Sequence, residues 1–193
     1  MSSSVSKNEH VISSDKAMKK VLVVVDMQND FVDGALGSKE AIAIVPAVVK
    51  KINEFEGDIF VTYDTHFENY LDTAEGKKLP VPHYIKGTAG WELNGEVKKA
   101  LAAKKFTPVE KKTFGSVELP ALIKKAVGDD TFTVELIGLC TDICVVSNAL
   151  IIKANFPENT IAVDAACCAG VTPEKHKAAL ETMRSCQIDV AGA

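Results

Sequence analysis

Residues 21–26 read Val-Leu-Val-Val-Val-Asp, and this stretch decides the fold. An unbroken run of aliphatic, mostly β-branched residues is typical of a strand buried on both faces, as strands of parallel sheets are. Further short apolar runs follow at residues 59–63, 107–109, 131–137 and 160–163. Segments with helical spacing lie between them or after them, at residues 41–55, 118–127, 144–154 and 173–185. Alternating strands and helices predict right-handed crossovers, and therefore a three-layer α/β/α fold of the Rossmann type with a mainly parallel sheet.

The composition fits one folded domain and argues against two classes of partner. The chain has 193 residues, 47% of them apolar, which is enough for one sizeable core. A net charge of -4 argues against nucleic acid as a partner, because neutralising phosphates requires an excess of Lys and Arg. No apolar run approaches the ~20 residues of a membrane helix. We expect a single domain at residues 18–193, after a Ser-rich, disordered leader at residues 1–17.

The cysteines indicate a reducing compartment. Five are present, an odd number, and all fall in the last third of the chain: Cys140, Cys144, Cys167, Cys168 and Cys186. This is a poor framework for disulfides, so we interpret them as reduced thiols. The leader also lacks the apolar core of a secretion signal. The cytoplasm is therefore the expected location.

Ligands of open parallel sheets bind beyond the carboxyl ends of the strands, so the residues that follow the apolar runs are the first candidates for a site. Cys144 follows the fourth run, after a turn in which Thr141 or Asp142 could cap a new helix. Helix N–H groups and the helix dipole would lower the pKa of a thiol in the first turn and activate it as a nucleophile. A buried structural cysteine is the alternative, and the commoner fate of an isolated Cys.

Two charged residues at other strand ends could complete a nucleophilic site. Asp26 ends the first run and could accept the thiol proton, while Lys111 follows the third run and could stabilise negative charge. Alone, either residue could equally be an ordinary turn or surface residue. Only their combination with Cys144 favours catalysis.

A metal site is a further possibility near the second strand. Asp64 and His66 are two residues apart, so their side chains share one side of an extended segment. His83 follows within residues 66–91, a long irregular insertion rich in Gly and Pro, of the kind that often binds ligands. Carboxylate with imidazole suits Zn, Fe or Mn better than Mg or Ca. The alternative is that both histidines are ordinary surface residues.

Two longer motifs resemble one family. Residues 25–31, Val-Asp-Met-Gln-Asn-Asp-Phe, and residues 138–145, Gly-Leu-Cys-Thr-Asp-Ile-Cys-Val, resemble the first-strand and nucleophile motifs of the isochorismatase-like cysteine hydrolases, the superfamily that contains nicotinamidases. The resemblance extends over residues 20–190. It implies that Asp26 is the catalytic acid/base and Cys144 the nucleophile. Residues 111–116 resemble the lysine segment of the family and assign its role to Lys111. Lys112 is the alternative, although a shift of one residue would send its side chain to the opposite face.

The resemblance also implies ligands for a metal and a substrate. Asp64, His66 and His83 match the metal ligands of the nicotinamidase branch, and Glu75 lies where some bacterial members have a fourth ligand. The implied cofactor is a divalent metal, zinc in the first place, with iron or manganese as alternatives. Phe31 would stack on a substrate ring. A second stacking aromatic is expected three residues before His83, where this chain has Pro80.

The activity implied by the resemblance is hydrolysis of a small carboxamide, nicotinamide above all, to the acid and ammonia through a thioester on Cys144. The backbone N–H groups of Cys140 and Cys144 would receive the oxyanion. A cis peptide bond between Cys140 and Thr141 is also implied. Family members are often homo-oligomers, so we expect symmetric self-assembly.

Two alternatives remain open at the level of sequence. The absence of an aromatic at Pro80 motivates the first alternative, a different amidase of the same superfamily that acts on N-carbamoyl or ureido compounds. More distantly, a flavodoxin-like binding or receiver module would also place an acid such as Asp26 at the end of its first strand. That alternative does not explain the capped cysteine turn together with a histidine-bearing insertion.

Overall fold

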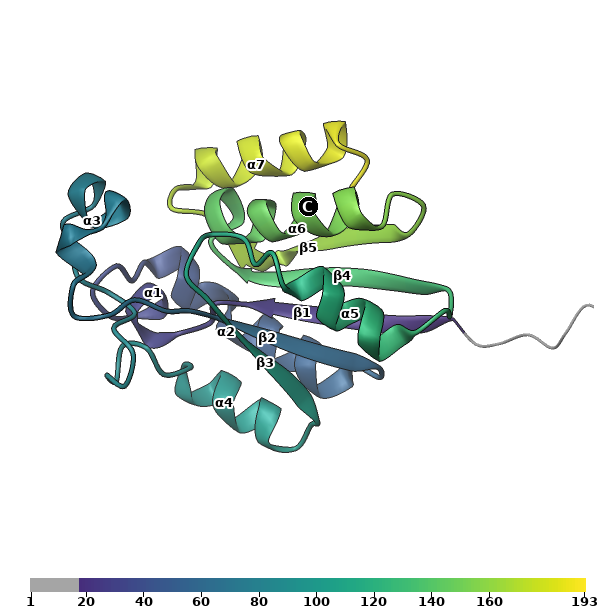
Figure 1. Cartoon of the computed structure of the whole chain (residues 1–193), viewed down its shortest axis with the longest axis horizontal. Helices are drawn as coiled ribbons and strands as arrows, with labels where there is room; N and C mark the ends of the chain where they lie inside the picture. Colours follow the sequence, from purple (N-terminus) through teal and green to yellow (C-terminus); the bar gives the residue numbers. More distant parts are fainter. Residues whose placement is uncertain (1–17) are drawn as a thin grey trace, which may run out of the picture.

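The computed structural model describes residues 18–193, and at its centre lies a six-stranded sheet in which every neighbouring pair is parallel (Figure 1). The strand order is β3-β2-β1-β4-β5-β6. The strands are β1 (Lys19–Val25), β2 (Asp58–Asp64), β3 (Phe106–Lys111), β4 (Phe132–Leu139), β5 (Thr160–Ala169) and β6 (Asp189–Ala191). The predicted fold class is confirmed. The predicted leader, residues 1–17, lies outside the described residues.

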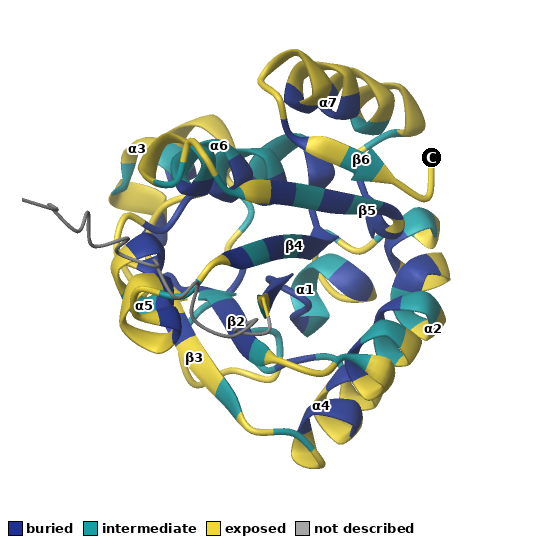
Figure 2. Ribbon diagram, turned by 90° about the vertical axis from the view of Figure 1, so that its right-hand side faces the viewer, coloured by how far each residue is buried: buried dark blue, intermediate teal, exposed yellow. Residues whose placement is uncertain are grey.

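Helices cover both faces of the sheet. They are α1 (Asn29–Val32), α2 (Lys39–Glu54), η1 (Tyr70–Asp72), α3 (Ala74–Lys78), α4 (Gly95–Ala102), α5 (Leu119–Val127), η2 (Thr141–Val145), α6 (Val146–Asn155) and α7 (Pro173–Ser185). Buried side chains of α5, α6 and α7 form one core with the sheet, and those of α2 and α4 form a second core. Figure 2 shows the buried strands between these helices, whose outer surfaces are exposed. None of the helices in residues 18–193 has the length and apolar character needed to cross a membrane.

Strand β1 explains why both layers form. Its side chains alternate between the faces: Val21, Val23 and Val25 enter the core with α5 to α7, while Leu22 and Val24 enter the core with α2 and α4. None of the five is more than 1% exposed. The apolar run in the sequence is therefore the shared centre of two cores, as a strand buried on both faces requires.

Several short elements were missed by the sequence prediction, among them α1, β6 and α4. Strand β6 has three residues, too few for a pattern to register, and it pairs with β5 at the edge of the sheet. Helix α4 follows the insertion and is capped by Asn94, whose side chain accepts a hydrogen bond from the backbone N–H of Glu96. The insertion itself is not wholly irregular, because it contains η1 and the capped helix α3.

A glycine permits the closest approach within the sheet. Gly138, near the end of β4, has a φ of +117°, and a Cβ there would lie 2.1 Å from the carbonyl oxygen of Val25. Since L residues with side chains avoid this φ and would collide with β1, only glycine fits. The ends of β1 and β4 are thereby held together, which brings Asp26 near the turn that carries Cys144.

Candidate active site

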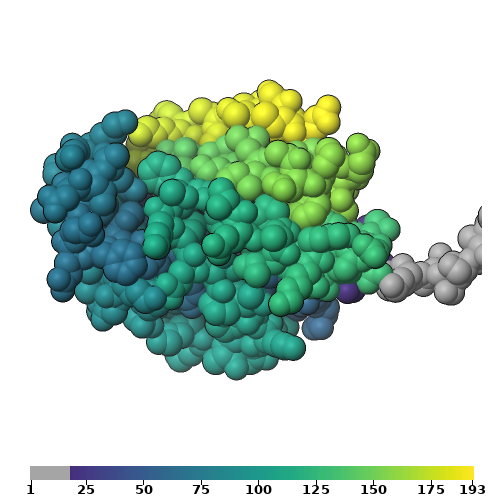
Figure 3. Space-filling view, viewed as in Figure 1, coloured from purple at the N-terminus to yellow at the C-terminus, as the bar shows by residue number. Residues whose placement is uncertain are grey.

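A pocket of about 540 Å³ opens at the carboxyl ends of the strands. The insertion covers this end of the molecule, as its blue residues show in Figure 3. The residues that line the pocket come from both regions, and the polar or reactive ones among them are Asp26, Asp64, His66, Thr73, Glu75, Lys78, His83, Tyr84, Lys112, Thr113, Cys140 and Cys144. The strand ends and the insertion therefore meet at one cavity, as the sequence predicted.

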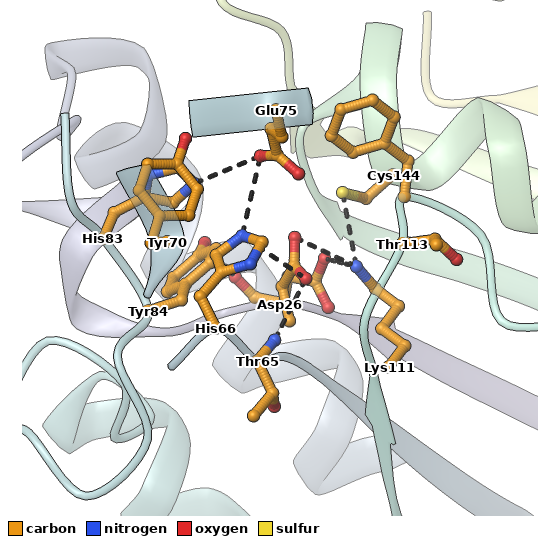
Figure 4. Close-up of polar contacts among 12 residues, drawn as sticks. Asp26, Thr65, His66, Tyr70, Glu75, His83, Tyr84, Lys111, Thr113 and Cys144 are labelled. Atoms are coloured by element: carbon orange, nitrogen blue, oxygen red, sulfur yellow. Dashed lines mark hydrogen bonds and ion pairs between the residues drawn. The ribbon is translucent and has the colours of Figure 1, made fainter. Parts of the chain in front are cut away.

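Asp26, Lys111 and Cys144 lie together at the base of this pocket (Figure 4). The Nζ atom of Lys111 is 2.7 Å from Oδ2 of Asp26 and 3.5 Å from the sulfur of Cys144. All three residues are buried, with exposed fractions of 6% or less. Lys111 thus contacts both a carboxylate that follows β1 and a thiol in the turn after β4. Lys112 is exposed at the pocket wall, which agrees with the assignment of the inner position to Lys111.

Burial and neighbouring charges together set the pKa values of Lys111 and Cys144. Burial would lower the pKa of Lys111, but Asp26, Cys144 and Asp64 outweigh burial and raise that pKa above its ordinary value, so the ammonium is retained. Burial raises the pKa of the Cys144 thiol well above its usual range, with Asp26 acting in the same direction and Lys111 opposing it. The prediction of a thiol pKa lowered by the helix start was wrong, because desolvation outweighs the helix dipole. A base must therefore take the proton of the Cys144 thiol before its sulfur can act as a nucleophile.

Asp26 is placed to be that base. It has a φ of +46°, directly after β1, and the hydroxyl of Thr62 on β2 donates a 2.6 Å hydrogen bond to its Oδ1. Its Oδ2 faces Lys111. Thr62 was not identified from the sequence, since a threonine inside an apolar strand carries no recognisable signal.

The turn that carries Cys144 differs from the prediction in three respects. It is a π-helical turn, η2, that precedes α6, and no side chain caps its start. Thr141 and Asp142 instead make tertiary contacts: the Thr141 hydroxyl is 2.8 Å from Nδ1 of His176, and Asp142 accepts a hydrogen bond from the N–H of Val171. The cis peptide bond joins Leu139 to Cys140. It was predicted one position later, where Thr141 already begins the helical turn.

A second polar cluster lies in the insertion. Oε1 of Glu75, on α3, is 3.5 Å from Nε2 of His66 and 3.6 Å from Nε2 of His83. Asp64 lies between this cluster and the catalytic candidates, since its Oδ1 is 4.0 Å from His66 Nε2 and its Oδ2 is 3.4 Å from Lys111 Nζ. The four predicted metal ligands are therefore neighbours, with Glu75 nearest to the two histidines.

These residues have the chemistry of a site for a divalent cation. Nδ1 of His83 is 2.7 Å from the carbonyl oxygen of Val81, which can only accept, so Nδ1 carries the proton and Nε2 presents a lone pair. Nε2 of His66 is buried and has no hydrogen-bond partner among residues 18–193. Burial would raise the pKa of Glu75, but protonated imidazoles of His66 and His83 would donate hydrogen bonds to it and lower this pKa to about 2. A bound cation would take the place of those protons. Two imidazole nitrogens and an ionised carboxylate fit zinc and similar ions.

Asp64 has a mixed environment. Burial raises its pKa to about 6, with Asp26 acting in the same direction and Lys111 opposing both. Gln28 holds the backbone around it, since its side chain accepts from the N–H of Asp64 and donates to the carbonyl of the same residue. Gln28 is wholly buried. It belongs to the first sequence motif, but its role as a backbone clamp was not identified from the sequence.

Aromatic rings form the remaining wall. Phe31 lines the pocket as predicted, and its ring stacks on Tyr84 with centroids 5.0 Å apart. Phe114 lines another part of the pocket, in the loop after β3. Pro80 does not line the cavity, whereas its neighbour Leu79 does. Phe31, Tyr84 and Phe114 thus supply aromatic surface that does not depend on position 80.

Comparison with known proteins places this architecture in a family. The model of the isochorismatase domain matches residues 20–193. An uncharacterized isochorismatase family protein, PncA, of Bacillus subtilis (strain 168) is 33% identical over 143 residues, 69% of this chain and 78% of that protein. The crystal structure of a nicotinamidase/pyrazinamidase, PncA, from B. subtilis superposes with a TM-score of 0.76 at 28% identity, over 90% of this chain and 100% of the other.

A second similar structure contains a metal. The pyrazinamidase of Pyrococcus horikoshii in complex with zinc has a TM-score of 0.72 and 25% identity, over 91% of this chain and 99% of the other. The family match extends over all six strands except the first residue of β1, and over both polar clusters of the pocket. This chain belongs to the isochorismatase family of hydrolases.

Proposed function

We propose that this protein hydrolyses nicotinamide to nicotinate and ammonia through a thioester on Cys144. The observation that carries the proposal is the contact of Lys111 with both Asp26 and Cys144 at the base of a pocket whose wall holds His66, Glu75 and His83. The names of the similar structures, a nicotinamidase/pyrazinamidase and a pyrazinamidase with zinc, support an aromatic carboxamide as the substrate class.

The reaction begins with a proton transfer. Asp26 takes the proton from the buried thiol of Cys144, and the sulfur forms a bond to the carboxamide carbon. The carbonyl oxygen becomes an oxyanion, which the backbone N–H groups of Cys140 and Cys144 receive. Asp26 then gives its proton to the amide nitrogen as the C–N bond breaks, so ammonia leaves and a thioester remains.

The second half repeats the same roles with water. Asp26 takes a proton from a water molecule, whose oxygen attacks the thioester carbon. The C–S bond breaks, the sulfur regains a proton from Asp26, and the carboxylic acid is released. The ammonium of Lys111, 2.7 Å from the Asp26 carboxylate, stabilises the negative charge that develops in the site.

The walls of the pocket orient the ring. His66, Glu75 and His83, with Asp64 beside them, would hold a divalent metal, with zinc as the first candidate and iron or manganese as alternatives. When bound, such an ion would supply a Lewis-acidic contact for a ring nitrogen. Phe31 and Phe114 supply apolar contacts to the ring itself. We also propose a cytoplasmic location and a homo-oligomeric assembly, on the cysteine pattern and on the general frequency of symmetric oligomers.

The test is ammonia release from nicotinamide by the purified protein, with metal content measured on the same sample. Cys144→Ala should lower kcat by about 10⁴-fold or more. Cys186→Ala is a matched control, because Cys186 is exposed at the end of α7 and should leave the rate unchanged. If metal-loaded protein with an alkylatable Cys144 releases no ammonia, nicotinamide is the wrong substrate. N-carbamoyl and ureido compounds are then the next amides to assay.

A further inference from the structure

Asn148 is a wholly buried polar residue that contacts residues of the pocket wall. It lies near the start of α6, four residues after Cys144, and it is absent from the pocket lining. Its side-chain nitrogen donates to the carbonyl oxygen of Cys144 at 2.8 Å and to that of Phe114 at 3.2 Å. Its side-chain oxygen accepts from the N–H of Ser116 at 2.9 Å. One amide thus connects the helix of the nucleophile to a loop.

The connected loop, residues 112–118, forms a wall of the pocket. It joins β3 to α5, and Lys112, Thr113 and Phe114 line the cavity. The other side-chain hydrogen bonds of the loop are local, from Thr113 to Gly115 and from the N–H of Leu119 to the hydroxyl of Ser116. Within residues 18–193, no further hydrogen bond connects this loop to η2 or α6. Gly115 also packs on Ser147 and Ile151 of α6. Asn148 therefore supplies the hydrogen bonds, but not the whole contact, between the Phe114 wall and the helix that follows the nucleophile turn.

The chemistry of the contact requires an amide. Two backbone carbonyls need a donor and one backbone N–H needs an acceptor, and a primary amide offers both on adjacent atoms. A carboxylate at this position would place negative charge against two carbonyl oxygens. An aliphatic side chain of the same size would fill the space but remove three hydrogen bonds to backbone groups, two of them buried. The two replacements therefore break the same connection in different ways.

Asn148 contacts Cys144 only at its backbone carbonyl, and other residues hold the reacting side chains. Asp26 is fixed by Thr62 and Lys111, and Lys111 reaches Cys144 from β3. Phe114, by contrast, is 43% exposed and is restrained through its backbone carbonyl. Loss of the Asn148 amide would thus release the wall of the pocket and leave the proton-transfer group in place.

We propose that Asn148 is a positioning residue that fixes the Phe114 wall relative to Cys144 and so determines how tightly a substrate ring is held. The proposal rests on the proposed amidase function for its kinetic readout. Loss of the Asn148 amide should change KM more than kcat. The reason is that the Phe114 wall contacts the bound ring equally in the ground state and in the transition state.

The kinetic test compares Asn148→Leu and Asn148→Asp with the wild-type protein in nicotinamide hydrolysis. Both variants should raise KM by about tenfold and change kcat by less than about threefold. Asn155→Leu is the matched control: Asn155 lies on the same helix, is exposed, and donates to the carbonyl of Ile151. It should leave both constants unchanged. A fall in kcat at constant KM in the Asn148 variants overturns the proposal.

A double-mutant cycle identifies the route of the effect. In a Phe114→Ala background the further change Asn148→Leu should alter KM by less than about twofold, because the wall through which Asn148 acts is already missing. Additive effects of the two substitutions would show that Asn148 acts elsewhere, and would overturn its assignment to the Phe114 wall.

A measurement that needs no substrate separates this proposal from the proposed function. Amide hydrogen exchange in residues 112–118 should be at least about tenfold faster in Asn148→Leu and Asn148→Asp than in the wild type, while exchange in α7 is unchanged. Unchanged exchange in the loop of either folded variant overturns the proposal even if nicotinamide is hydrolysed. Faster exchange confined to the loop supports it even if the substrate proves to be a different amide.

Discussion

Two clusters of polar side chains meet in the pocket, and they are built in different ways. The first, here called the sheet cluster, consists of Asp26, Asp64, Lys111 and Cys144, which lie at the ends of β1, β2 and β3 and in the turn after β4. The second, the insertion cluster, consists of His66, Glu75 and His83. All members of the sheet cluster are at most 6% exposed, whereas the side chain of Glu75 is 22% exposed and lies on a five-residue helix.

Because the two clusters are built differently, we expect them to contribute differently to folding stability and to ligand binding. In the sheet cluster one ammonium faces two carboxylates in a buried setting, so removal of the lysine would leave buried carboxylates without a cation. In the insertion cluster a carboxylate lies between two imidazoles that can each be neutral, and a bound cation would complete it. We expect changes in the sheet cluster to affect both folding and chemistry, and changes in the insertion cluster to affect mainly metal binding.

The largest expected effect is that of Lys111→Met. Two buried carboxylates would then face each other without a cation, which should destabilise the fold by about 3 kcal/mol and lower the melting temperature by roughly 10 °C. The value of kcat should fall by about 10²- to 10⁴-fold. Circular dichroism melts and ammonia release measure the two effects. Lys112→Met is the control for stability, because Lys112 is exposed and should keep the wild-type melting temperature.

A reversed result would change the assignment of the lysine. If Lys112→Met lost more activity and stability than Lys111→Met, the buried ion pair of Lys111 with Asp26 would not be what supports activity and stability. The sheet cluster would then cease to be the part of the site in which folding and chemistry coincide.

The next largest effect concerns the metal. Zinc should stabilise the wild-type protein by about 2.7 kcal/mol at a free concentration 100 times its Kd. His83→Ala should weaken zinc binding by at least about 10- to 100-fold, since losses of that size follow even from removal of groups that only support a ligand. Thermal melts at graded zinc concentrations measure this. Without zinc, the melting temperature of His83→Ala should stay closer to that of the wild type than that of Lys111→Met.

The opposite result for His83→Ala would contradict the distinction between the two clusters. Unchanged zinc affinity in His83→Ala, with a large loss of stability in the absence of metal, would make the insertion cluster a structural element. The proposed ion would then have to bind elsewhere in the pocket.

The two clusters also differ in how far the sequence could predict them. Asp26 and Cys144 could be placed together because parallel strands end at one edge of the sheet, and the apolar run at residues 21–25 identified that sheet. The position of Glu75 could not be derived in this way, since it depends on how the insertion folds back over the strands. Only the resemblance to a family placed it near the histidines.

Other features were beyond the sequence for physical reasons. The pKa of the Cys144 thiol depends on burial, which no local pattern records, and the helix dipole alone gave the wrong direction. The π-helical turn was predicted as a capped helix because Thr141 and Asp142 have the chemistry of caps but are used for contacts with the region of α7. Strand β6 is too short to produce a periodic signal.

A smaller effect is expected from Glu75→Gln. The amide keeps an oxygen ligand but loses the negative charge between the two histidines, so zinc affinity should fall by about tenfold, less than for His83→Ala. Isothermal titration with zinc measures the change. Glu96→Gln is the matched control, because Glu96 is exposed on α4 and should leave the affinity unchanged. If Glu75→Gln binds zinc as tightly as the wild type, Asp64 rather than Glu75 is the acidic ligand.

The smallest expected effect is a pH dependence of the folding stability. It comes from His176, which contacts Thr141 in the turn that carries Cys144. Burial lowers the pKa of His176, an effect that Asp142 opposes and Lys177 reinforces. The unfolded chain, with a histidine pKa near 6.5, therefore binds more protons than the folded one at mildly acidic pH. The stabilising contribution of the neutral imidazole is complete above that pH, and it is lost as the pH falls from about 6.5 toward the lower folded pKa.

His176→Gln removes this titration and retains a side chain that can hydrogen-bond to Thr141. Between pH 7.5 and 5.5 the variant should therefore lose less stability than the wild type, by an amount below about 1 kcal/mol because the imidazole is partly exposed. Urea unfolding at several pH values measures both slopes, and the contributions of His66 and His83 cancel in the difference between the two proteins. A steeper slope in His176→Gln would mean that the imidazole is charged in the folded state. The turn of the nucleophile would then be stabilised by an ion pair with Asp142 rather than by the neutral hydrogen bond to Thr141.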